Sequence, residues 1–313
     1  MTRTGKRNAS AGKAVPGEIR IGVGGWTYAP WRGSFYPAGL PQNRELEYAS
    51  RKLTSIEING TYYGAQKPAT FARWHDETPA GFVFSVKAPR FVMNRRVLAD
   101  AGPGITRFLT GGVLQLKDKL GPINWQFLPT KEFEPADFEA FLRLLPKDVS
   151  GRALRHAVEV RHASFRCAEF IALARGHGVA IVIAGDSSYP QIADCTAPFA
   201  YARIMGTQPK EELGYSDAAL TRWAARAKAW VSGAAPVGMD LVEPQGATDE
   251  PRDVYLYVIS GAKARNPAAA MALISKSQAP ASRRARPDAS SARGAGAPAG
   301  RSPASRPRGR GIA

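Results

Sequence analysis

The sequence predicts an α/β protein, a (β/α)8 TIM-type barrel flanked by disordered basic N- and C-terminal tails. Eight short β-like runs alternate with segments of helical pattern, as the repeating unit of such a barrel requires. Residues 18–275 hold all of these runs and match the ~250 residues that eight units occupy. A doubly wound open sheet is the alternative that the same alternation allows.

The first strand candidate, IRIGVGGW, contains the run GVGG at 22–25, which invites comparison with a nucleotide-binding loop. The full GxGxxG pattern and a helix directly after it are missing, so we interpret these small residues as packing positions in the barrel. The strand candidates are 19–26, 55–60, 82–89, 123–129, 156–162, 179–186, 199–206 and 254–260.

Three of the intervening segments carry apolar stripes at helical spacing. Gly121-Pro122 closes the first predicted helix, Pro135 stands near the first turn of the second, and the third lies between Asp217 as N-cap and Gly233. The stripes consist of Ile105, Phe108, Leu109, Val113, Leu116 and Leu120, then Phe138, Phe141, Leu142 and Leu145, then Leu220, Trp223, Ala227, Trp230 and Val231.

Four segments depart from this alternation. Residues 188–198 are too short and Pro-interrupted for a full helix, and residues 233–253 form a long polar excursion. The tails 1–17 and 276–313 have almost no large apolar side chains, so they cannot bury enough surface to become ordered. They carry +4 and +8 of the formal net charge of +17, and most of the basicity therefore lies outside the barrel.

Composition also indicates the size of the core and the cellular compartment of the protein. With 313 residues and 44% hydrophobic residues, the chain can build a large core. Its two cysteines, Cys167 and Cys195, form no CxxC motif, which favours a reducing compartment. Neither a membrane-spanning apolar run nor an apolar secretory segment is present in the sequence, so we expect a cytoplasmic protein without a membrane partner.

The ends of the strand candidates carry the main functional signal. In a barrel of this type, the active site lies at the carboxyl ends of the strands. Seven of the eight candidates end in hydrogen-bonding or charged side chains, and only the eighth, ending at Ser260, is plain. The side chains concerned are Trp26, Glu57, Asn59, Lys87, Gln126, Glu159, Arg161, His162, Asp186 and Arg203.

Alternation along each strand predicts which of these side chains share a face. Glu57 shares a face with Asn59, and we expect both to look into a solvated cleft at the barrel mouth rather than into the packed core. The alternative is a structural ion-pair network inside the mouth, because buried charges are costly unless they are paired. The other shared faces hold Ser85 with Lys87, Glu159 with Arg161, Val182 with Asp186, and Tyr201 with Arg203.

Three cations at one mouth, Lys87, Arg161 and Arg203, suit a ligand that bears a phosphate or carboxylate group. Trp26, Tyr28, Asn59 and Gln126 complete the predicted substrate-binding set. The predicted catalytic residues are Glu57, Glu159 and Asp186 as general acid and base, with His162 as a proton shuttle.

Two further interpretations stay open. The carboxylates with His162 are also a candidate site for Mg²⁺ or Mn²⁺, although the neighbouring Lys and Arg would compete for them, so no metal or other cofactor is predicted. The loop after the first strand holds Tyr28, Trp31, Phe35 and Tyr36, which either close over the mouth as a lid or pack on the next helix. We interpret the other histidines, His75, His156 and His177, as structural.

Six stretches resemble the YecE-like family, the domain-of-unknown-function family numbered 72. They are IRIGVGGWTYAPWRGSFYP, IEINGTYY, KPATFARWHDETPAGFVFSVKAPRF, LGPINWQFLP, HAVEVRHASF and FAYARIMG, which together span nearly all of 19–275. The resemblance implies a barrel of the triosephosphate-isomerase type and no established activity. Members often end the last strand with an FNND-like sequence, where this chain has VISG at 258–261.

Two classes of function remain. The leading hypothesis is a small-molecule enzyme of the hydrolase, lyase or isomerase type that acts on a small anionic substrate in the barrel mouth. The alternatives are a nucleic-acid-binding or nuclease-like barrel assisted by weak contacts of the basic tails, and a non-catalytic ligand-binding protein. No aromatic residues interleave the basic residues of the tails, which disfavours base stacking there.

Overall fold

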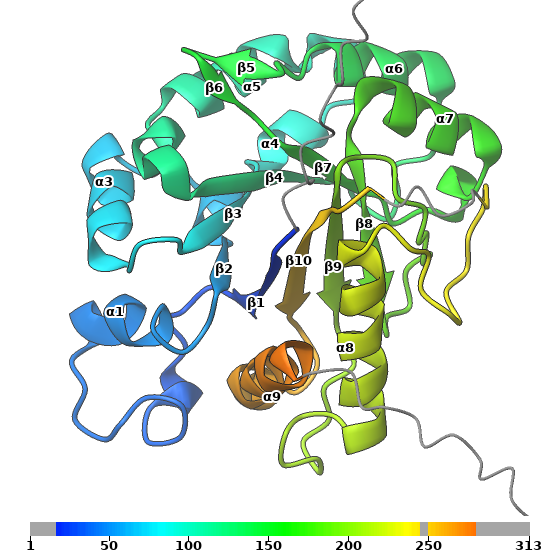
Figure 1. The fold of residues 1–313 in the computed structure, drawn as a ribbon. Coiled ribbons are helices and arrows are strands. Elements are labelled where there is room, and N and C mark those ends of the chain that lie inside the picture. The colour runs from blue at the N-terminus through cyan, green and yellow to red at the C-terminus, as the bar shows by residue number, and fades with distance from the viewer. Residues whose placement is uncertain (1–16, 245–249, 280–313) are drawn as a thin grey trace, which may run out of the picture. The chain divides into compact units, whose positions relative to one another are not determined.

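The computed structural model describes residues 17–244 and 250–279. Eight parallel strands close into one barrel in the order β1-β10-β9-β8-β7-β4-β3-β2 (Figure 1), which confirms the predicted fold. The barrel strands are β1 (Ile19–Gly24), β2 (Ser55–Ile58), β3 (Val83–Lys87), β4 (Leu120–Gln126), β7 (His156–Glu159), β8 (Ala180–Gly185), β9 (Phe199–Ile204) and β10 (Asp253–Val258).

Helices connect these strands along the outside of the barrel (Figure 1). The α-helices are α1 (Glu45–Ala49), α2 (Gly60–Tyr63), α3 (Pro68–Glu77), α4 (Arg90–Met93), α5 (Gly102–Thr110), α6 (Pro135–Arg143), α7 (Ala168–His177), α8 (Asp217–Val231) and α9 (Asn266–Gln278). The 3-10 helices are η1 (Ala29–Trp31), η2 (Gln42–Arg44), η3 (Leu98–Ala101), η4 (Val113–Lys119), η5 (Ala163–Phe165) and η6 (Lys263–Arg265).

The crossover from β8 to β9 contains no helix over residues 186–198, as the short and Pro-interrupted sequence predicts. Residues 233–244 and 250–252 of the predicted polar excursion also contain neither helix nor strand. Helix α9 continues to Gln278, beyond the predicted domain boundary at 275. The tails predicted to be disordered are 1–17 and 276–313. This prediction is wrong for 276–278, which belong to α9, whereas 1–16 and 280–313 lie outside the described residues and their disorder stays a prediction.

The helix predicted from Ile105 to Leu120 is wrong. Helix α5 ends at Thr110, two glycines follow, and the chain continues as the 3-10 helix η4 before β4 begins at Leu120. Gly112 has a φ of +121°, and a Cβ there would lie 2.7 Å from the Cα of Pro68 in α3. The apolar stripe misled the prediction because α5 and η4 both bury their apolar residues, including Ile105 and Leu116, on either side of this break.

Two smaller features also differ from the sequence prediction. Helix α8 is capped by Ser216, whose hydroxyl accepts a hydrogen bond from the backbone N–H of Ala219, and not by Asp217. The hairpin of β5 (Asp148–Val149) and β6 (Arg152–Ala153) was not predicted. Ser150 and Gly151 in its turn have positive φ values. The strands on either side are too short for their sequence to predict this turn.

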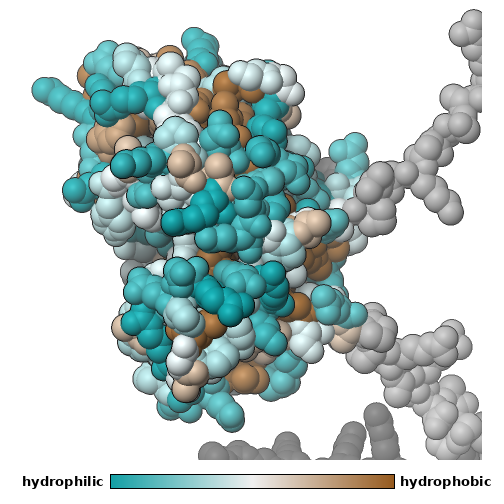
Figure 2. Space-filling view, turned by 90° about the vertical axis from the view of Figure 1, so that its left-hand side faces the viewer, coloured by the Kyte–Doolittle hydropathy of each residue, from teal (hydrophilic) through white to brown (hydrophobic). Residues whose placement is uncertain are grey.

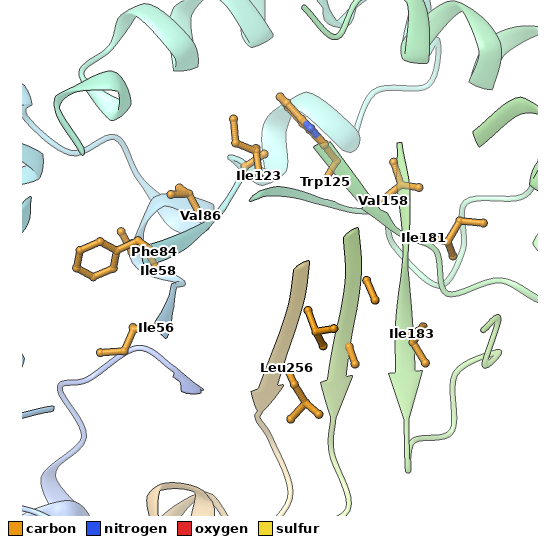
Figure 3. Packing of buried hydrophobic residues seen from close by; sticks show 14 of the residues in the cluster. Ile56, Ile58, Phe84, Val86, Ile123, Trp125, Val158, Ile181, Ile183 and Leu256 are labelled. Atoms are coloured by element: carbon orange, nitrogen blue, oxygen red, sulfur yellow. The ribbon is translucent and has the colours of Figure 1, made fainter. Parts of the chain in front are cut away.

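Buried apolar residues fall into two clusters. The larger one lies between the strands and the surrounding helices, and Figure 3 shows part of it, including Ile56, Phe84 and Val158. The smaller cluster includes Val182 and Tyr255 and fills the inside of the barrel. Because side chains alternate along each strand, one face of a strand packs on the helices and the other points into the barrel. The smaller cluster draws its residues from β3, β7, β8, β9 and β10 and the residue that follows β10.

The surface drawn in Figure 2 is covered mostly by hydrophilic residues, and hydrophobic residues appear on it in separate small areas. Among the helices of the described residues, none has the combined length and apolar character that a membrane-crossing segment needs.

Candidate functional site

A cavity of about 620 Å³ opens at the carboxyl ends of the barrel strands. Its wall is built by the last residues of β3 and β4, by Arg203 of β9, and by residues that directly follow β2, β7 and β10. This is the end at which barrels of this type carry their sites. The lining residues are Gly24, Gly25, Trp26, Thr27, Tyr28, Ile58, Asn59, Gly60, Tyr63, Gln66, Trp74, Lys87, Gln126, Arg161, Arg203, Ile259, Ser260, Lys263 and Asn266.

All seven residues predicted to bind substrate lie on this wall. They come from six separate segments of the chain, which the barrel brings together, so the sequence prediction of a shared position is correct. Their role in binding stays a prediction. The seven are Trp26, Tyr28, Asn59, Lys87, Gln126, Arg161 and Arg203.

Glu57 and Glu159 lie beneath the cavity and do not line it. Both are completely buried, so the expectation that Glu57 faces a solvated cleft is wrong. Strand register explains the error, because Glu57 is paired with Ser85 of β3, whereas Lys87, two residues further on, reaches the wall. Asn59, two residues beyond Glu57, does line the cavity.

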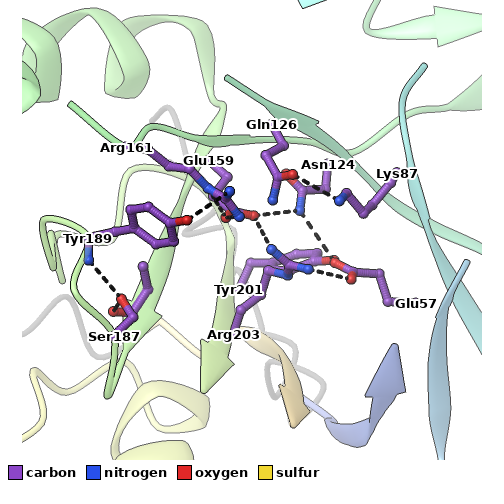
Figure 4. Close-up of polar contacts among 11 residues, drawn as sticks. Glu57, Lys87, Asn124, Gln126, Glu159, Arg161, Ser187, Tyr189, Tyr201 and Arg203 are labelled. Atoms are coloured by element: carbon purple, nitrogen blue, oxygen red, sulfur yellow. Dashed lines mark hydrogen bonds and ion pairs between the residues drawn. The ribbon is translucent and has the colours of Figure 1, made fainter. Parts of the chain in front are cut away.

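Arg203 joins the two buried carboxylates (Figure 4). Its Nη2 donates to Glu57 Oε2 at 3.0 Å, and its Nη1 donates to Glu159 Oε2. Glu57 Oε1 also accepts from the hydroxyl of Tyr201 at 2.6 Å, and Asn124 Nδ2 donates to both carboxylates at 3.3 and 3.2 Å. The ion-pair network that the sequence offered as an alternative is therefore present.

Arg161 completes this network from the cavity side. Its Nε and Nη2 both donate to Glu159 Oε1, at 3.0 and 2.7 Å, and its Nη1 donates to the hydroxyl of Tyr189 at 3.2 Å. Burial alone raises the pKa of Glu159, but Arg203, Arg161 and Lys87 outweigh it and hold this pKa at about 2. Glu159 is therefore ionised at neutral pH, and its two arginines fix it in place.

Lys87 differs from the two arginines because no carboxylate of the described residues pairs with it. It is 6% exposed, its Nζ donates to Gln126 Oε1 at 2.9 Å, and the same nitrogen lies 4.0 Å from the ring centre of Tyr62. Burial, followed by repulsion from Arg203, lowers the pKa of Lys87 to about 8. Two carboxylates thus balance two arginines, and Lys87 adds a surplus positive charge.

Three buried polar atoms of the cavity wall have no hydrogen-bond partner among the residues that the structure describes. They are the side-chain nitrogen Nε2 of Gln126, the oxygen Oδ1 of Asn59 and the Nε of Arg203. An unpartnered buried donor or acceptor is costly, so these atoms are typical of a wall that pairs with a bound group. Two are donors and one is an acceptor.

The cavity does not include His162 or Asp186, so the expectation that they share the mouth with the other residues is wrong. Strand β8 ends at Gly185, and Asp186 follows at a φ of +52°, where its carboxylate accepts from the indole N–H of Trp223 at 2.8 Å. His162 lies three residues beyond the end of β7, and its Nδ1 pairs with the hydroxyl of Ser164. Alternation along a strand does not extend past the strand end.

These positions also bear on the metal interpretation. Within the parts of the chain that the structure describes, no three His, Cys, Asp or Glu side chains gather in a way that could hold a metal ion. Glu57 and Glu159 are instead ion-paired with arginines. The four residues proposed as ligands thus do not fit a common metal ion.

The remaining histidines and the aromatic loop have structural contacts. His156 is buried and accepts from the indole N–H of Trp125 at 3.0 Å. His75 pairs with Asp76 and Asp118, and His177 stands in the last turn of α7. Trp31, Phe35 and Tyr36 of the loop are buried. Phe35 and Tyr36 pack on Tyr48 of α1, and Trp31 packs on both of them, which favours packing over a lid. Tyr28 lines the cavity.

Gly22 and Gly24 of GVGG act as packing positions, whereas a Cβ on Gly25 would meet no neighbour. A Cβ on Gly22 would lie 1.7 Å from the carbonyl oxygen of Ser55 on β2, so only glycine allows the two strands to approach here. Gly25 has a φ of +72° and donates its N–H to the carbonyl of Glu57 at 2.8 Å.

Sequence reasoning missed several residues of the site. Asn124 shares a strand face with Gln126, so the spacing within INWQ could have indicated it. The search for polar residues at strand ends could not find Tyr62 or Lys263. Tyr62 lies on the short helix α2 and Lys263 on η6, both beyond the strand ends. Lys263 lies over the ring of Tyr28 at 4.2 Å and adds a further cation to the rim.

A family model described as protein of unknown function DUF72 matches residues 20–292. A search of curated proteins gives no match. The fold is similar to a crystal structure of a DUF72 family protein from Thermotoga maritima MSB8, with 20% identity and a TM-score of 0.61, covering 82% of this chain and 97% of that one. It is also similar to one from Enterococcus faecalis V583, with 17% identity, a TM-score of 0.59, and coverage of 83% and 97%.

Proposed function

The chain belongs to the DUF72 family, and we propose that it is a small-molecule enzyme whose cavity binds a substrate through a carboxylate or phosphate group. The observation that carries this proposal is the surplus cation. Arg161 and Arg203 are balanced by Glu159 and Glu57, whereas Lys87 lies on the wall without an ion pair among the described residues. A bound anion would supply the missing partner.

The hydrogen-bonding capacity of the wall supports the same ligand class. Gln126 Nε2 and Arg203 Nε are buried donors that find no acceptor within the described part of the chain, and an anionic oxygen accepts several hydrogen bonds at once. The carboxylates beneath hold the guanidinium groups in fixed positions, so the binding groups do not have to become ordered when the ligand enters.

The arrangement changes the predicted roles in acid–base chemistry. Glu57 and Glu159 are enclosed by their own partners and do not line the cavity. Lys87 is the wall residue whose pKa, at about 8, lies nearest to neutrality among those with a resolved shift. We therefore assign proton transfer to Lys87 rather than to the carboxylates, in line with the rule that an acid–base group works best near the operating pH.

Calorimetric titration of the full chain with inorganic phosphate and with malonate tests the proposal. We expect the Lys87→Met variant to bind either anion about tenfold to a hundredfold more weakly, because a hydrogen bond to a charged group contributes about 1.5–3 kcal/mol. The matched control is Lys210→Met, which removes an exposed lysine outside the cavity. Failure of the wild type to bind any anion, or equal affinities for both variants, would contradict the proposal.

A further inference from the structure

We propose that Lys87 is a nucleophilic amine that forms an imine with an aldehyde or ketone bearing a carboxylate or phosphate group. This inference rests on the proposed function, because the acid group of the substrate is the anion that the cavity binds. It narrows the substrate class from small anions in general to carbonyl compounds such as keto acids and phosphorylated aldehydes.

The surroundings of Lys87 leave its nitrogen available to the cavity. The described residues give Nζ one hydrogen-bond acceptor, the neutral Gln126 Oε1. Lys119 is equally buried, at 5% exposed, yet its Nζ is enclosed by three acceptors, the carbonyls of His75 and Thr78 and the hydroxyl of Thr78, and it does not line the cavity. Burial alone therefore does not distinguish the two lysines, whereas access to the cavity and free N–H groups do.

The charge environment favours the neutral amine that such a reaction needs. Arg203 and Arg161 repel the ammonium form of Lys87, Glu57 and Glu159 attract it, and burial decides the balance in favour of a lowered pKa of about 8. At pH 7, roughly one-tenth of the amine is then neutral, against roughly one part in three thousand at the ordinary value of 10.5. Desolvated lysines of this kind act as nucleophiles toward carbonyl substrates.

The reaction is balanced without an oxidant or reductant. The lone pair of Nζ adds to the carbonyl carbon, the C=O π electrons move to oxygen, and a proton passes from nitrogen to that oxygen to give a carbinolamine. Loss of the oxygen as water, with the second amine proton, leaves a C=N bond. A proton taken up on the imine nitrogen restores one positive charge, which the face of the Tyr62 ring, 4.0 Å from Nζ, stabilises.

The opposite wall fixes the orientation of the substrate. Arg203 lies on β9 and Lys87 on β3, with β4, β7 and β8 between them in the closed order of eight strands, so Arg203 lies across the cavity from Lys87. A carboxylate or phosphate held by Arg203 and Arg161 would place a carbonyl group of the same small molecule toward Nζ. Figure 4 shows Arg161 and Lys87 on opposite sides of Gln126 and Asn124, with the guanidinium group of Arg203 below them and paired with Glu57 and Glu159.

Reductive trapping in the wild-type protein tests the inference. The full chain is incubated with pyruvate and sodium borohydride, digested, and mapped by mass spectrometry. We expect the reduced adduct on Lys87, at a higher yield than on the exposed Lys263 at the rim, and no adduct on Lys119. Acetone, a ketone of similar size without the carboxylate, should label Lys87 at least about tenfold less, and excess phosphate should compete with pyruvate.

The outcomes separate the two proposals. Labelling of Lys87 no greater than that of Lys263 would overturn the imine, as would equal labelling by pyruvate and acetone. Phosphate binding in the calorimeter without any adduct on Lys87 would overturn the imine and leave the proposed function standing. Absence of both phosphate binding and adduct would overturn both. Because the mapping uses the wild-type protein, the result does not depend on whether a Lys87 variant folds.

Discussion

Replacing Glu159 by glutamine tests the buried ion-pair network on which the cavity wall rests. Glu159 accepts two hydrogen bonds from Arg161 and one from Arg203, and it is completely buried. Glutamine has nearly the same shape but no charge, so it leaves two guanidinium groups with reduced compensation. Removing one partner from a buried ion pair costs about 3–5 kcal/mol.

The pKa of Glu159 gives an independent magnitude. This pKa lies at about 2 in the folded protein, against an ordinary value of 4.5. Each pH unit of this difference corresponds to about 1.4 kcal/mol, so the charged form contributes about 3 kcal/mol to folding. Because the folded pKa is depressed, this contribution is complete above about pH 4.5 and is lost as the pH falls toward about 2.

Urea denaturation of the wild type and of Glu159→Gln across this pH range measures the effect. We expect the free energy of unfolding of the variant to be lower by about 3 kcal/mol at pH 7, and the difference to shrink steadily between about pH 4.5 and 2 as the wild-type carboxylate takes up its proton. The control is Glu139→Gln on α6, whose partly exposed pair with Arg143 contributes at most about 0.5 kcal/mol. A difference that stays constant with pH, or one below about 1 kcal/mol at pH 7, would refute the reasoning.

Two further predictions follow from the same geometry. Tyr201→Phe removes the hydroxyl that donates to the buried Glu57 at 2.6 Å. We expect the free energy of unfolding, measured in urea, to fall by about 1.5–3 kcal/mol. No measurable change would mean that the buried carboxylate does not depend on this hydrogen bond. His162→Ala and Asp186→Asn alter side chains outside the cavity, so calorimetry should show a phosphate affinity within about twofold of the wild type. A tenfold loss in either variant would place that residue in the site.

The strands and the residues that enter the barrel could be predicted from the sequence because both depend on local alternation. Each expected strand run overlaps an observed barrel strand, and the shared face inferred for Tyr201 and Arg203 is confirmed, because both side chains reach the buried network. The predicted helix over Ile105–Leu120 failed for a non-local reason. The segment is broken at Gly112, where Pro68 of α3 approaches closely. This contact comes from another helix, so the sequence of the segment does not indicate it.

The depth of each side chain in the barrel could not be predicted in this way. It depends on the pairing between strands and on the side chains that separate each residue from the cavity. Lys87 and Asn124 are paired across β3 and β4, yet the lysine reaches the cavity wall and the shorter asparagine stays buried. Side-chain length decides between them.

Gln126 and Glu159 are likewise paired across β4 and β7, and here charge decides. Gln126 stays on the wall, whereas Arg161 folds back over Glu159 and closes it off from the cavity. Strand ends that carry both acidic and basic side chains therefore predict a site with a charged ligand-facing surface. The sign of that surface is the sign of the net charge that remains after the side chains have formed ion pairs with one another. In this barrel that sign is positive, and it is carried inside the cavity by Lys87 and at its rim by Lys263.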